Sequence, residues 1–320
     1  MKKPKRAFIT GGAGFIGSNV VEELICRGYE TTVYDNLSLG KYEFIKRFVD
    51  DGKCLFIKGD LLDFKTLSES MKQNDIVFHL AANSDIAKGE EFTDTDLKQG
   101  TLATYNVLEA MRLNGISEII FSSSSAIYGD AGTKEIDENY GPLLPISLYG
   151  ASKLAGEGLL TAFSHNYGIK VWIFRFANVV GDNSTHGAVH DFIERLIIDP
   201  KNLKILGDGK QAKPYIYVKD CVNGILFGYE KACEKVNFFN LGTSGATSVT
   251  KIADIVVEEM GLSDVKYHYT GGDRGWRSDI PQVRFNISKL TKLGWKAKYS
   301  SDMAVRIAAK AIIKQKKNFK

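Results

Sequence analysis

No apolar run in the 320-residue sequence approaches the length of a membrane-spanning helix. The first residues, Met1 to Arg6, lead into a predicted strand rather than a secretion signal, so we expect a cytoplasmic protein. The chain has only four cysteines, which are Cys26, Cys54, Cys221 and Cys233. Their spacing does not suit zinc, and a chain of this size does not need disulfides, so we interpret them as free thiols.

The sequence also lacks a strong charge of one sign and any spacing of histidines typical of a metal site. Its net charge of +4 is small, and its basic residues lack an interleaved aromatic platform, which argues against nucleic-acid binding. The five histidines, His79, His165, His186, His190 and His268, predict no metal site. A hydrophobic fraction of 44% and a charged fraction of 25% are typical of a globular chain long enough for two domains.

Glycine is placed informatively near the start of the sequence. The apolar run Arg6–Thr10 predicts a buried strand, and the next residues are Gly11-Gly12-Ala13-Gly14-Phe15-Ile16-Gly17. A helix is expected from about Phe15 to Arg27. Glycines between a strand and a helix allow a tight turn and close approach of the backbone to a pyrophosphate, which the helix N-terminus favours. We therefore predict a dinucleotide site that includes Gly11, Gly14, Phe15, Ile16 and Gly17.

An acidic residue follows these glycines at the distance that dinucleotide binding requires. A second predicted strand, Thr31–Tyr34, ends in Asp35. A carboxylate there accepts hydrogen bonds from the adenosine ribose and repels the additional phosphate of NADP, so NAD is the expected cofactor. The alternative is a glycine-rich structural turn with Asp35 as a solvated strand end.

A tyrosine and a lysine, Tyr149 and Lys153, are spaced to lie on one face of a helix. A nearby ammonium favours the ionised phenol, so we expect a tyrosine pKa lowered toward neutral pH. The serine run Ser122–Ser125 could supply a hydroxyl that hydrogen-bonds the reacting oxygen. By itself this spacing also occurs by chance.

Predicted strands alternate with helices through the first half of the chain. Further short strands are expected at 55–58, 76–80, 118–121 and 171–174, with long helices at about 97–114 and 149–167. The pattern predicts a Rossmann-like doubly wound α/β fold, a parallel sheet with helices on both faces, and a smaller C-terminal α/β substrate domain. We place the domains at 1–180 and 181–320, with some later segments returning to the first. The two long helices could also pair across a homodimer interface.

Together these residues resemble the extended short-chain dehydrogenases/reductases, and within them the nucleotide-sugar epimerases and dehydratases. The chain looks most like UDP-glucose (UDP-galactose) 4-epimerases of the archaeal type. The resemblance covers essentially the whole chain. Besides the glycine loop and the Tyr149–Lys153 stretch, it rests on Asp35–Ser38, Gly59–Leu61, His79–Ala82, Phe121–Gly129, Arg175–Gly181 and Gly272–Trp276.

The resemblance implies an NAD-dependent epimerase with Tyr149 as acid and base. Lys153 would hold the nicotinamide ribose and lower the tyrosine pKa, and Ser124 would hydrogen-bond the developing ketone. The sugar would be oxidised at C4, turn over as a 4-keto intermediate and be reduced on its other face. Further residues implied at the cofactor site are Asn36, Asp60, Leu61, Leu80, Ala81, Ala82 and Ser122.

Other reactions of the same family stay open to different degrees. The related 4,6-dehydratases carry a catalytic glutamate two residues before the Tyr128 position, where this chain has Ala126. We therefore favour a dehydratase less, because elimination needs an acid to protonate the leaving hydroxyl. The sequence argues less strongly against a decarboxylase or a C4 dehydrogenase than against a dehydratase. A different class of function, a non-catalytic NAD sensor, is disfavoured by the presence of the complete tyrosine, lysine and serine set.

Substrate contacts are implied in the second half of the chain, at Asn178, Lys213, Arg274 and Asp279. These residues look like ligands of the diphosphate and ribose of a nucleotide sugar, which we expect to be UDP-linked. Lys213 stands where relatives often have arginine, so it supplies charge without a bidentate fork. Val283 stands where a bulky tyrosine can restrict the sugar, which suggests room for an N-acetyl group.

Overall fold

The computed structural model describes residues 4–317, which form two compact units. Unit 1 comprises the residues up to 129, 142–175 and 226–239. Unit 2 comprises 130–141, 176–225 and the residues from 240 onward. Each unit therefore draws on several separate stretches of the chain, and the domain boundary expected at residue 180 stays a prediction.

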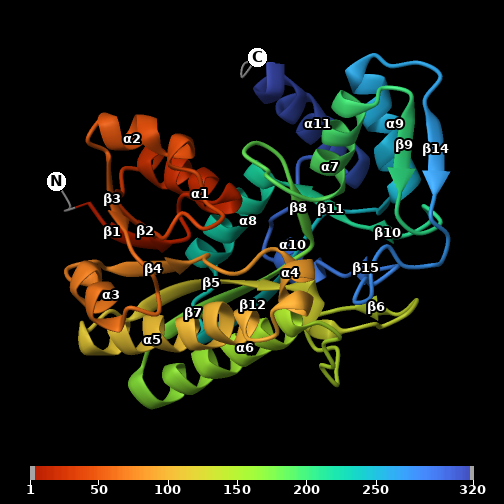
Figure 1. Cartoon of the computed structure of the whole chain (residues 1–320). Helices are drawn as coiled ribbons and strands as arrows, with labels where there is room; N and C mark the ends of the chain where they lie inside the picture. Colours follow the sequence, from red (N-terminus) through yellow and green to blue (C-terminus); the bar gives the residue numbers. More distant parts are fainter. Residues whose placement is uncertain (1–3, 318–320) are drawn as a thin grey trace. The chain divides into compact units, whose positions relative to one another are not determined.

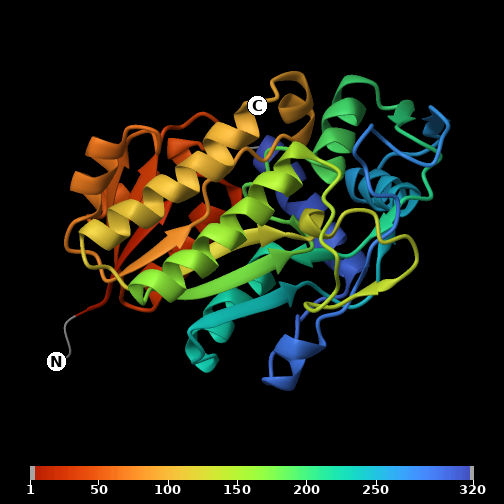
Figure 2. The same ribbon diagram turned by 90° about the horizontal axis from the view of Figure 1, so that it is seen from below.

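A seven-stranded sheet forms the centre of unit 1, in the order β12-β7-β5-β4-β1-β2-β3. Neighbouring strands from β3 to β5 pair in parallel, and β7 and β12 run in the same direction (Figure 2). The strands are β1 (Arg6–Thr10), β2 (Glu30–Asp35), β3 (Cys54–Lys58), β4 (Ile76–His79), β5 (Glu118–Ser124), β7 (Lys170–Phe176) and β12 (Val236–Leu241). This topology confirms the predicted Rossmann-like doubly wound sheet.

Helices cover both faces of the sheet (Figure 1). On one face lie α3 (Phe64–Met71), α5 (Ala103–Leu113) and α6 (Leu148–Tyr167), and the other carries α1 (Phe15–Cys26), α2 (Lys46–Asp50) and the C-terminal end of α8 (Val218–Lys231). Sheet residues such as Phe8, Val77 and Phe121 form one apolar core with α3, α5 and α6. Because strands buried on both faces must be apolar throughout, the short apolar runs of the sequence located them well.

The sequence predicted one regular helix at 97–114, and the structure differs from this prediction in the first turn. Residues Leu97–Leu102 form a π-helical turn, and the regular helix α5 begins only at Ala103. Gly100 lies so close to α6 that a Cβ there would come within 2.4 Å of the Ser152 hydroxyl oxygen. The Thr104 hydroxyl donates to the Gly100 carbonyl at 2.6 Å. The widened turn thus accompanies a close approach between two helices, which sequence periodicity does not report.

Helix α6 begins and ends at residues suited to its termini. The Ser147 side chain caps its start by accepting a hydrogen bond from the Gly150 amide at 3.0 Å. Gly168, in the left-handed conformation, ends it. This cap places Tyr149 in the first turn of the helix and Lys153 in the second.

Unit 2 contains short paired strands and a three-helix core. The helices α7 (Ala188–Ile198), α9 (Val249–Met260) and α11 (Ser301–Lys317) bury a shared apolar cluster that includes Ile193, Ile252 and Val305. The pairs are β8 (Asn178–Val180) with β11 (Tyr215–Tyr217), β9 (Asn202–Ile205) with β14 (Lys266–Tyr269), β10 (Ala212–Lys213) with β13 (Thr247–Ser248), and β6 (Glu135–Ile136) with β15 (Arg284–Phe285). The remaining helices of the described residues are α4 (Ile86–Glu91) and α10 (Ser288–Lys292), with 3-10 turns at Tyr42–Phe44 and Ser125–Tyr128. Among residues 4–317, no helix is long and apolar enough to cross a lipid bilayer.

Candidate active site

The glycine loop joins β1 to α1 at the carboxyl edge of the sheet. A Cβ at Gly17 would lie 2.1 Å from the Gly11 carbonyl oxygen, so a side chain there is excluded. Gly11 has a φ of +69° and lies against the backbone of Ala81. The N-terminus of α1 has no side-chain cap. Its first amides are therefore available for an anion, and the loop fits the pyrophosphate of a dinucleotide.

Asp35 holds this loop in place. Its carboxylate accepts a hydrogen bond from the Ala13 amide at 3.0 Å and another from the Leu37 amide at 2.8 Å. Burial raises the pKa of Asp35, whereas these two amide bonds act in the opposite direction. The sequence predicted Asp35 as a ribose ligand, and the structure adds a bond from this carboxylate to the glycine loop itself.

The other residues expected at the cofactor site lie around the same edge. The side-chain amide of Asn36 donates to the Asp60 carboxylate at 3.2 Å, and the same carboxylate accepts from the main-chain amide of Leu62 at 2.9 Å. The segment of Leu80, Ala81 and Ala82 follows β4 directly. Leu61 is buried in the apolar core of unit 1. The structure thus brings Asn36 together with Asp60 and places the backbone after β4 beside Gly11.

Ser124, Tyr149 and Lys153 meet where β5 ends and α6 begins. The Tyr149 hydroxyl is hydrogen-bonded to the Ser124 side chain. The Ser124 hydroxyl oxygen also accepts from the Ala126 amide at 3.1 Å, which fixes its orientation. Lys153 donates to the Ser122 carbonyl at 2.6 Å, and its Nζ lies 5.8 Å from the centre of the Tyr149 ring. The predicted grouping of these side chains is therefore present.

The ionisation of this group differs from the expectation. Burial raises the pKa of Tyr149 to about 12, although the Ser124 hydrogen bond acts to lower it. Burial also lowers the pKa of Lys153 to about 7, against the raising effects of Asp96 and Glu157. The expectation that the pKa of Tyr149 is lowered toward neutral pH is therefore wrong for the chain alone. The physical reason is that removal from water disfavours both charged forms.

His79 is a packed residue at the end of β4. Its Nδ1 lies 2.7 Å from the Thr10 hydroxyl and its Nε2 lies 3.0 Å from the Thr104 hydroxyl. Burial, with a smaller effect of Lys153, lowers its pKa to about 3. The imidazole is therefore neutral and links β1, β4 and α5. Within residues 4–317, no group of three or more His, Cys, Asp or Glu side chains is placed to hold a metal ion.

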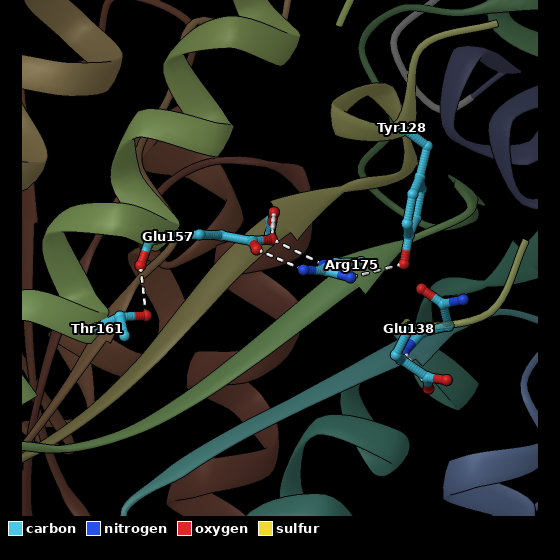
Figure 3. A network of polar contacts seen from close by, with 7 residues as sticks. Tyr128, Glu138, Glu157, Thr161 and Arg175 are labelled. Atoms are coloured by element: carbon cyan, nitrogen blue, oxygen red, sulfur yellow. Dashed lines mark hydrogen bonds and ion pairs between the residues drawn. The ribbon is translucent and has the colours of Figure 1, made fainter. Parts of the chain in front are cut away.

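A buried ion pair that the sequence analysis missed supports α6 one turn beyond Lys153 (Figure 3). The guanidinium of Arg175 donates to the two carboxylate oxygens of Glu157 at 3.0 and 2.7 Å. Ser123 also donates to Glu157, at 2.5 Å, and Arg175 donates to the Tyr128 hydroxyl at 2.9 Å. These bonds tie α6 to β5 and β7. The missed signal was a glutamate four residues after Lys153, on the same helix face.

Three of the four expected substrate residues gather within unit 2. The Lys213 ammonium lies 2.5 Å from the Asp279 carboxylate, and Arg274 donates to the Asp279 carbonyl at 2.6 Å. Arg274 also pairs with Asp130 at 2.6 Å. Asp130 was not among the predicted site residues.

Asn178, the fourth expected substrate residue, lies at the start of β8. Its side chain is hydrogen-bonded to the Tyr215 hydroxyl, and its main-chain amide donates to the Pro214 carbonyl at 3.2 Å. Pro214 directly follows Lys213 in the sequence. Asn178 is therefore attached to the chain segment that carries Lys213.

Comparisons with known proteins agree with this arrangement. The profile of the NAD dependent epimerase/dehydratase family matches residues 7–242. A putative UDP-glucose 4-epimerase of Methanocaldococcus jannaschii is 33% identical over 90% of this chain and 92% of its own length. A UDP-N-acetyl-α-D-glucosaminuronate decarboxylase of Bacillus cytotoxicus is 34% identical over 90% and 91% of the two chains.

A solved structure is similar over nearly the whole chain. It is the UDP-N-acetylglucosamine 4-epimerase of Methanobrevibacter ruminantium M1 in complex with UDP-N-acetylmuramic acid. That protein is 29% identical, with a TM-score of 0.86 over 98% of this chain and 99% of the other.

The fold and the glycine loop define a dinucleotide-dependent enzyme. More specifically, the chain belongs to the NAD dependent epimerase/dehydratase family. NAD is its cofactor, and the family resemblance drawn from the sequence is confirmed.

Proposed function

We propose that this enzyme inverts the configuration at C4 of a UDP-linked sugar through a transient 4-keto sugar. The observation that carries the proposal is the hydrogen bond between the Tyr149 hydroxyl and Ser124, with Lys153 on the next turn of the same helix. A phenol held beside a second hydroxyl is suited to move one proton at one oxygen. The names of similar proteins, which include UDP-sugar 4-epimerases, support the substrate class.

In this proposal Tyr149 takes the proton of the C4 hydroxyl and later returns it to the same oxygen. Ser124 donates a hydrogen bond to that oxygen while it is a carbonyl, which stabilises the ketone. When bound, NAD supplies a hydride acceptor and donor at C4 and, in its oxidised form, a positive charge. Because the proton and the hydride both return to the sugar, the reaction has no net oxidation.

The proposed NAD ligands come from six stretches of unit 1. The amides at the start of α1 would bind the pyrophosphate, and Asp35 would accept from the adenosine ribose with its remaining lone pairs. Lys153 would donate to the nicotinamide ribose. The remaining proposed contacts are Gly11, Gly14, Phe15, Ile16, Gly17, Asn36, Asp60, Leu61, Leu80, Ala81, Ala82, Ser122 and Tyr149.

A diphosphate would interact with the cations of unit 2. We propose Asn178, Lys213, Arg274 and Asp279 as substrate ligands, and two of them are the partly buried cations Lys213 and Arg274. Each now has a carboxylate partner, so a bound diphosphate must compete with Asp279 and Asp130. Lys213 also lies 5.0 Å from the centre of the Trp276 ring, which limits the directions it can take.

A decarboxylase acting on a nucleotide-linked uronic acid is the second candidate. It is favoured by the 34% identity to a protein named as such a decarboxylase. Both reactions begin with oxidation at C4, and they differ in whether carbon dioxide then leaves the sugar. A dehydratase is less well supported, because Ala126 occupies the position at which that reaction needs an acid.

The decisive experiment incubates the purified enzyme with UDP-galactose, UDP-glucose, UDP-N-acetylglucosamine and UDP-glucuronic acid and follows the sugar ring by proton NMR. We expect inversion at C4 without accumulation of reduced nicotinamide. Loss of carbon dioxide from UDP-glucuronic acid would instead identify the decarboxylase. The Tyr149→Phe variant, with NAD still bound, is the control for each activity, and its full activity would contradict the proposal.

The same panel tests the width of the sugar site. Val283 is only partly buried, and a valine is smaller than the tyrosine that can occupy this place. We propose that UDP-N-acetylglucosamine is also a substrate. Strict rejection of this sugar by the native enzyme would contradict this point, whereas Val283→Tyr should lower its turnover more than that of UDP-glucose.

We further propose that the enzyme is a cytoplasmic homodimer. Large apolar side chains are exposed along the π-helical turn, α5 and the end of α6, namely Leu97, Leu102, Tyr105, Leu113 and Tyr167. A second copy of the same two helices would bury them as a four-helix contact. Light scattering should give twice the chain mass, and Tyr105→Glu should shift it toward the monomer. Free thiols at all four cysteines suit a reducing compartment.

A further inference from the structure

Asp96 is a buried carboxylate that the proposed reaction leaves without a role. Asp96 is only 2% exposed to solvent. One carboxylate oxygen, Oδ1, accepts a hydrogen bond from the Asn83 amide at 3.1 Å. The other, Oδ2, is buried without a hydrogen-bond partner among the described residues. Such an uncompensated oxygen is costly, so its retention calls for a function.

The segment that follows Asp96 packs against the helix that carries the tyrosine and the lysine. Asp96 immediately precedes the π-helical turn, and that turn packs against α6 through the close contact between Gly100 and Ser152. On the other side, a Cβ at Gly89 would lie 2.2 Å from Oδ2. Any side chain at Gly89 would therefore clash with the Asp96 carboxylate in its present position.

Asp96 is coupled electrostatically to both groups of the candidate catalytic pair. Its charge acts to raise the pKa of Lys153, against the larger lowering by burial, and it also acts to raise the pKa of Tyr149. Burial raises the pKa of Asp96 itself, whereas its bond to Asn83 and the charge of Lys153 act to lower it.

Among the described side chains, the other titratable groups around Lys153 and Asn83 have a charged partner, are neutral or are exposed. Glu157 of α6 also raises the pKa of Lys153, but its carboxylate is engaged by Arg175. His79 of β4 is neutral because burial lowers its pKa to about 3. Asp85, in the loop after β4, is exposed, and its amide donates to the Asn83 side chain. Of the two described carboxylates that raise the pKa of Lys153, Asp96 is therefore the one that is not paired with an arginine.

We propose that Asp96 is a positioning residue that acts as the buried counter-ion of Lys153 and keeps its ammonium charged beside Tyr149. This inference rests on the proposed roles of Tyr149 and Lys153. Without the carboxylate, Lys153 would lose its proton at a lower pH, and Tyr149 would also ionise at a lower pH. Both limbs of the pH profile therefore move to lower pH: the alkaline limb, where Lys153 loses its proton, and the acid limb, where Tyr149 ionises.

The test compares the native enzyme with Asp96→Asn, which keeps the shape of the side chain and its bond to Asn83. In the first measurement, kcat/KM for C4 inversion of UDP-galactose is followed from pH 6 to pH 9. The activity of the variant relative to the native enzyme should be roughly tenfold higher at pH 6 than at pH 8.5, as expected for an acidward shift of both limbs. A uniform loss at every pH would show a merely structural role and overturn the inference.

A second measurement is independent of turnover. The NAD-free protein is labelled with carbon-13 at lysine Cε, the Lys153 resonance is assigned from its absence in Lys153→Met, and its shift is followed with pH. The midpoint should move to lower pH in Asp96→Asn. An unchanged midpoint would overturn the inference even if the enzyme is an epimerase. A moved midpoint would support it even if no UDP-sugar is turned over and the proposed function fails.

Asp94→Asn is the matched control, because Asp94 lies two residues earlier and forms an exposed pair with Lys98. It should leave both readouts unchanged. Should Asp96→Asn not fold, Asp96→Ser removes the charge with a smaller side chain and is expected to produce the same two shifts.

Discussion

Lys153 donates a hydrogen bond from its ammonium nitrogen to the main-chain carbonyl of Ser122 at 2.6 Å. This bond joins the second turn of α6 to β5 two residues before Ser124. It therefore sets the distance from the lysine to the strand end and the rotation of the helix about its axis. Tyr149, one turn earlier, is brought to Ser124 by the same constraint.

The burial of Lys153 should be visible in the stability of the NAD-free chain. Its pKa falls from 10.5 to about 7 on folding, mainly through burial. The unfolded state then binds more protons between these values, so the cost of the buried lysine is full below pH 7 and disappears as the pH rises toward 10. The difference in free energy of unfolding between Lys153→Met and the native chain should therefore be greatest below pH 7 and shrink toward pH 10.

Urea denaturation at a series of pH values measures this difference. The control is Lys98→Met, since Lys98 is an exposed lysine of the π-helical turn. This variant should show no such trend. A difference between Lys153→Met and the native chain that is independent of pH would contradict the assignment of a depressed lysine pKa.

Loss of the Ser124 hydroxyl should reduce turnover and alter its pH dependence. The hydrogen bond from Ser124 acts to lower the pKa of Tyr149, so Ser124→Ala raises that pKa further. We expect kcat to fall by roughly 10²-fold, since one positioned proton-transfer partner is removed. The acid limb of the profile should move to higher pH. Ser125→Ala serves as the control, and equal profiles for the two variants would argue against a role for Ser124.

The ion pair of Glu157 and Arg175 should matter for stability more than its surface counterparts. Both side chains are 8% exposed. Glu157→Gln leaves the guanidinium buried without its counter-charge and should cost about 3 to 5 kcal/mol in urea unfolding. The exposed pair of Glu109 and Arg112 gives a control, for which Glu109→Gln should cost less than about 1 kcal/mol. Similar costs for the two variants would contradict the importance assigned to the buried pair.

Removing the carboxylate that competes for Arg274 should strengthen substrate binding. Asp130 and Arg274 are each about one-third exposed, so their pair is partly screened by water. Asp130→Asn should lower KM for the UDP-sugar about two- to fivefold and leave kcat nearly unchanged, because a diphosphate no longer displaces the aspartate. Asp208→Asn, next to the exposed Lys210, is the control. A rise in KM for Asp130→Asn would show that this carboxylate supports the site instead.

The sequence located the sheet and the main candidate residues because their signals are local. A buried parallel strand is an apolar run, the glycine loop is contiguous, and Tyr149 and Lys153 are one helical turn apart. The assignment of Ser124, Asp60 and the substrate residues needed the family resemblance, since nothing in their local spacing marks them.

The rest depended on contacts between distant parts of the chain. Asp96 gains its setting from Gly89 and from the packing of the π-helical turn on α6, and neither is visible in a periodic pattern. The pKa values of Tyr149 and Lys153 are governed by burial, which outweighs the pairwise effect that their spacing suggested.

The central claim is that Tyr149 moves a proton at C4 while the hydride leaves and returns to the same carbon. The most direct test converts UDP-galactose carrying deuterium at C4 and determines by NMR and mass spectrometry where the label lies in the product. We predict UDP-glucose with its deuterium retained at C4. Exchange of the label with solvent, or its accumulation in reduced nicotinamide with release of a ketone, would contradict the account.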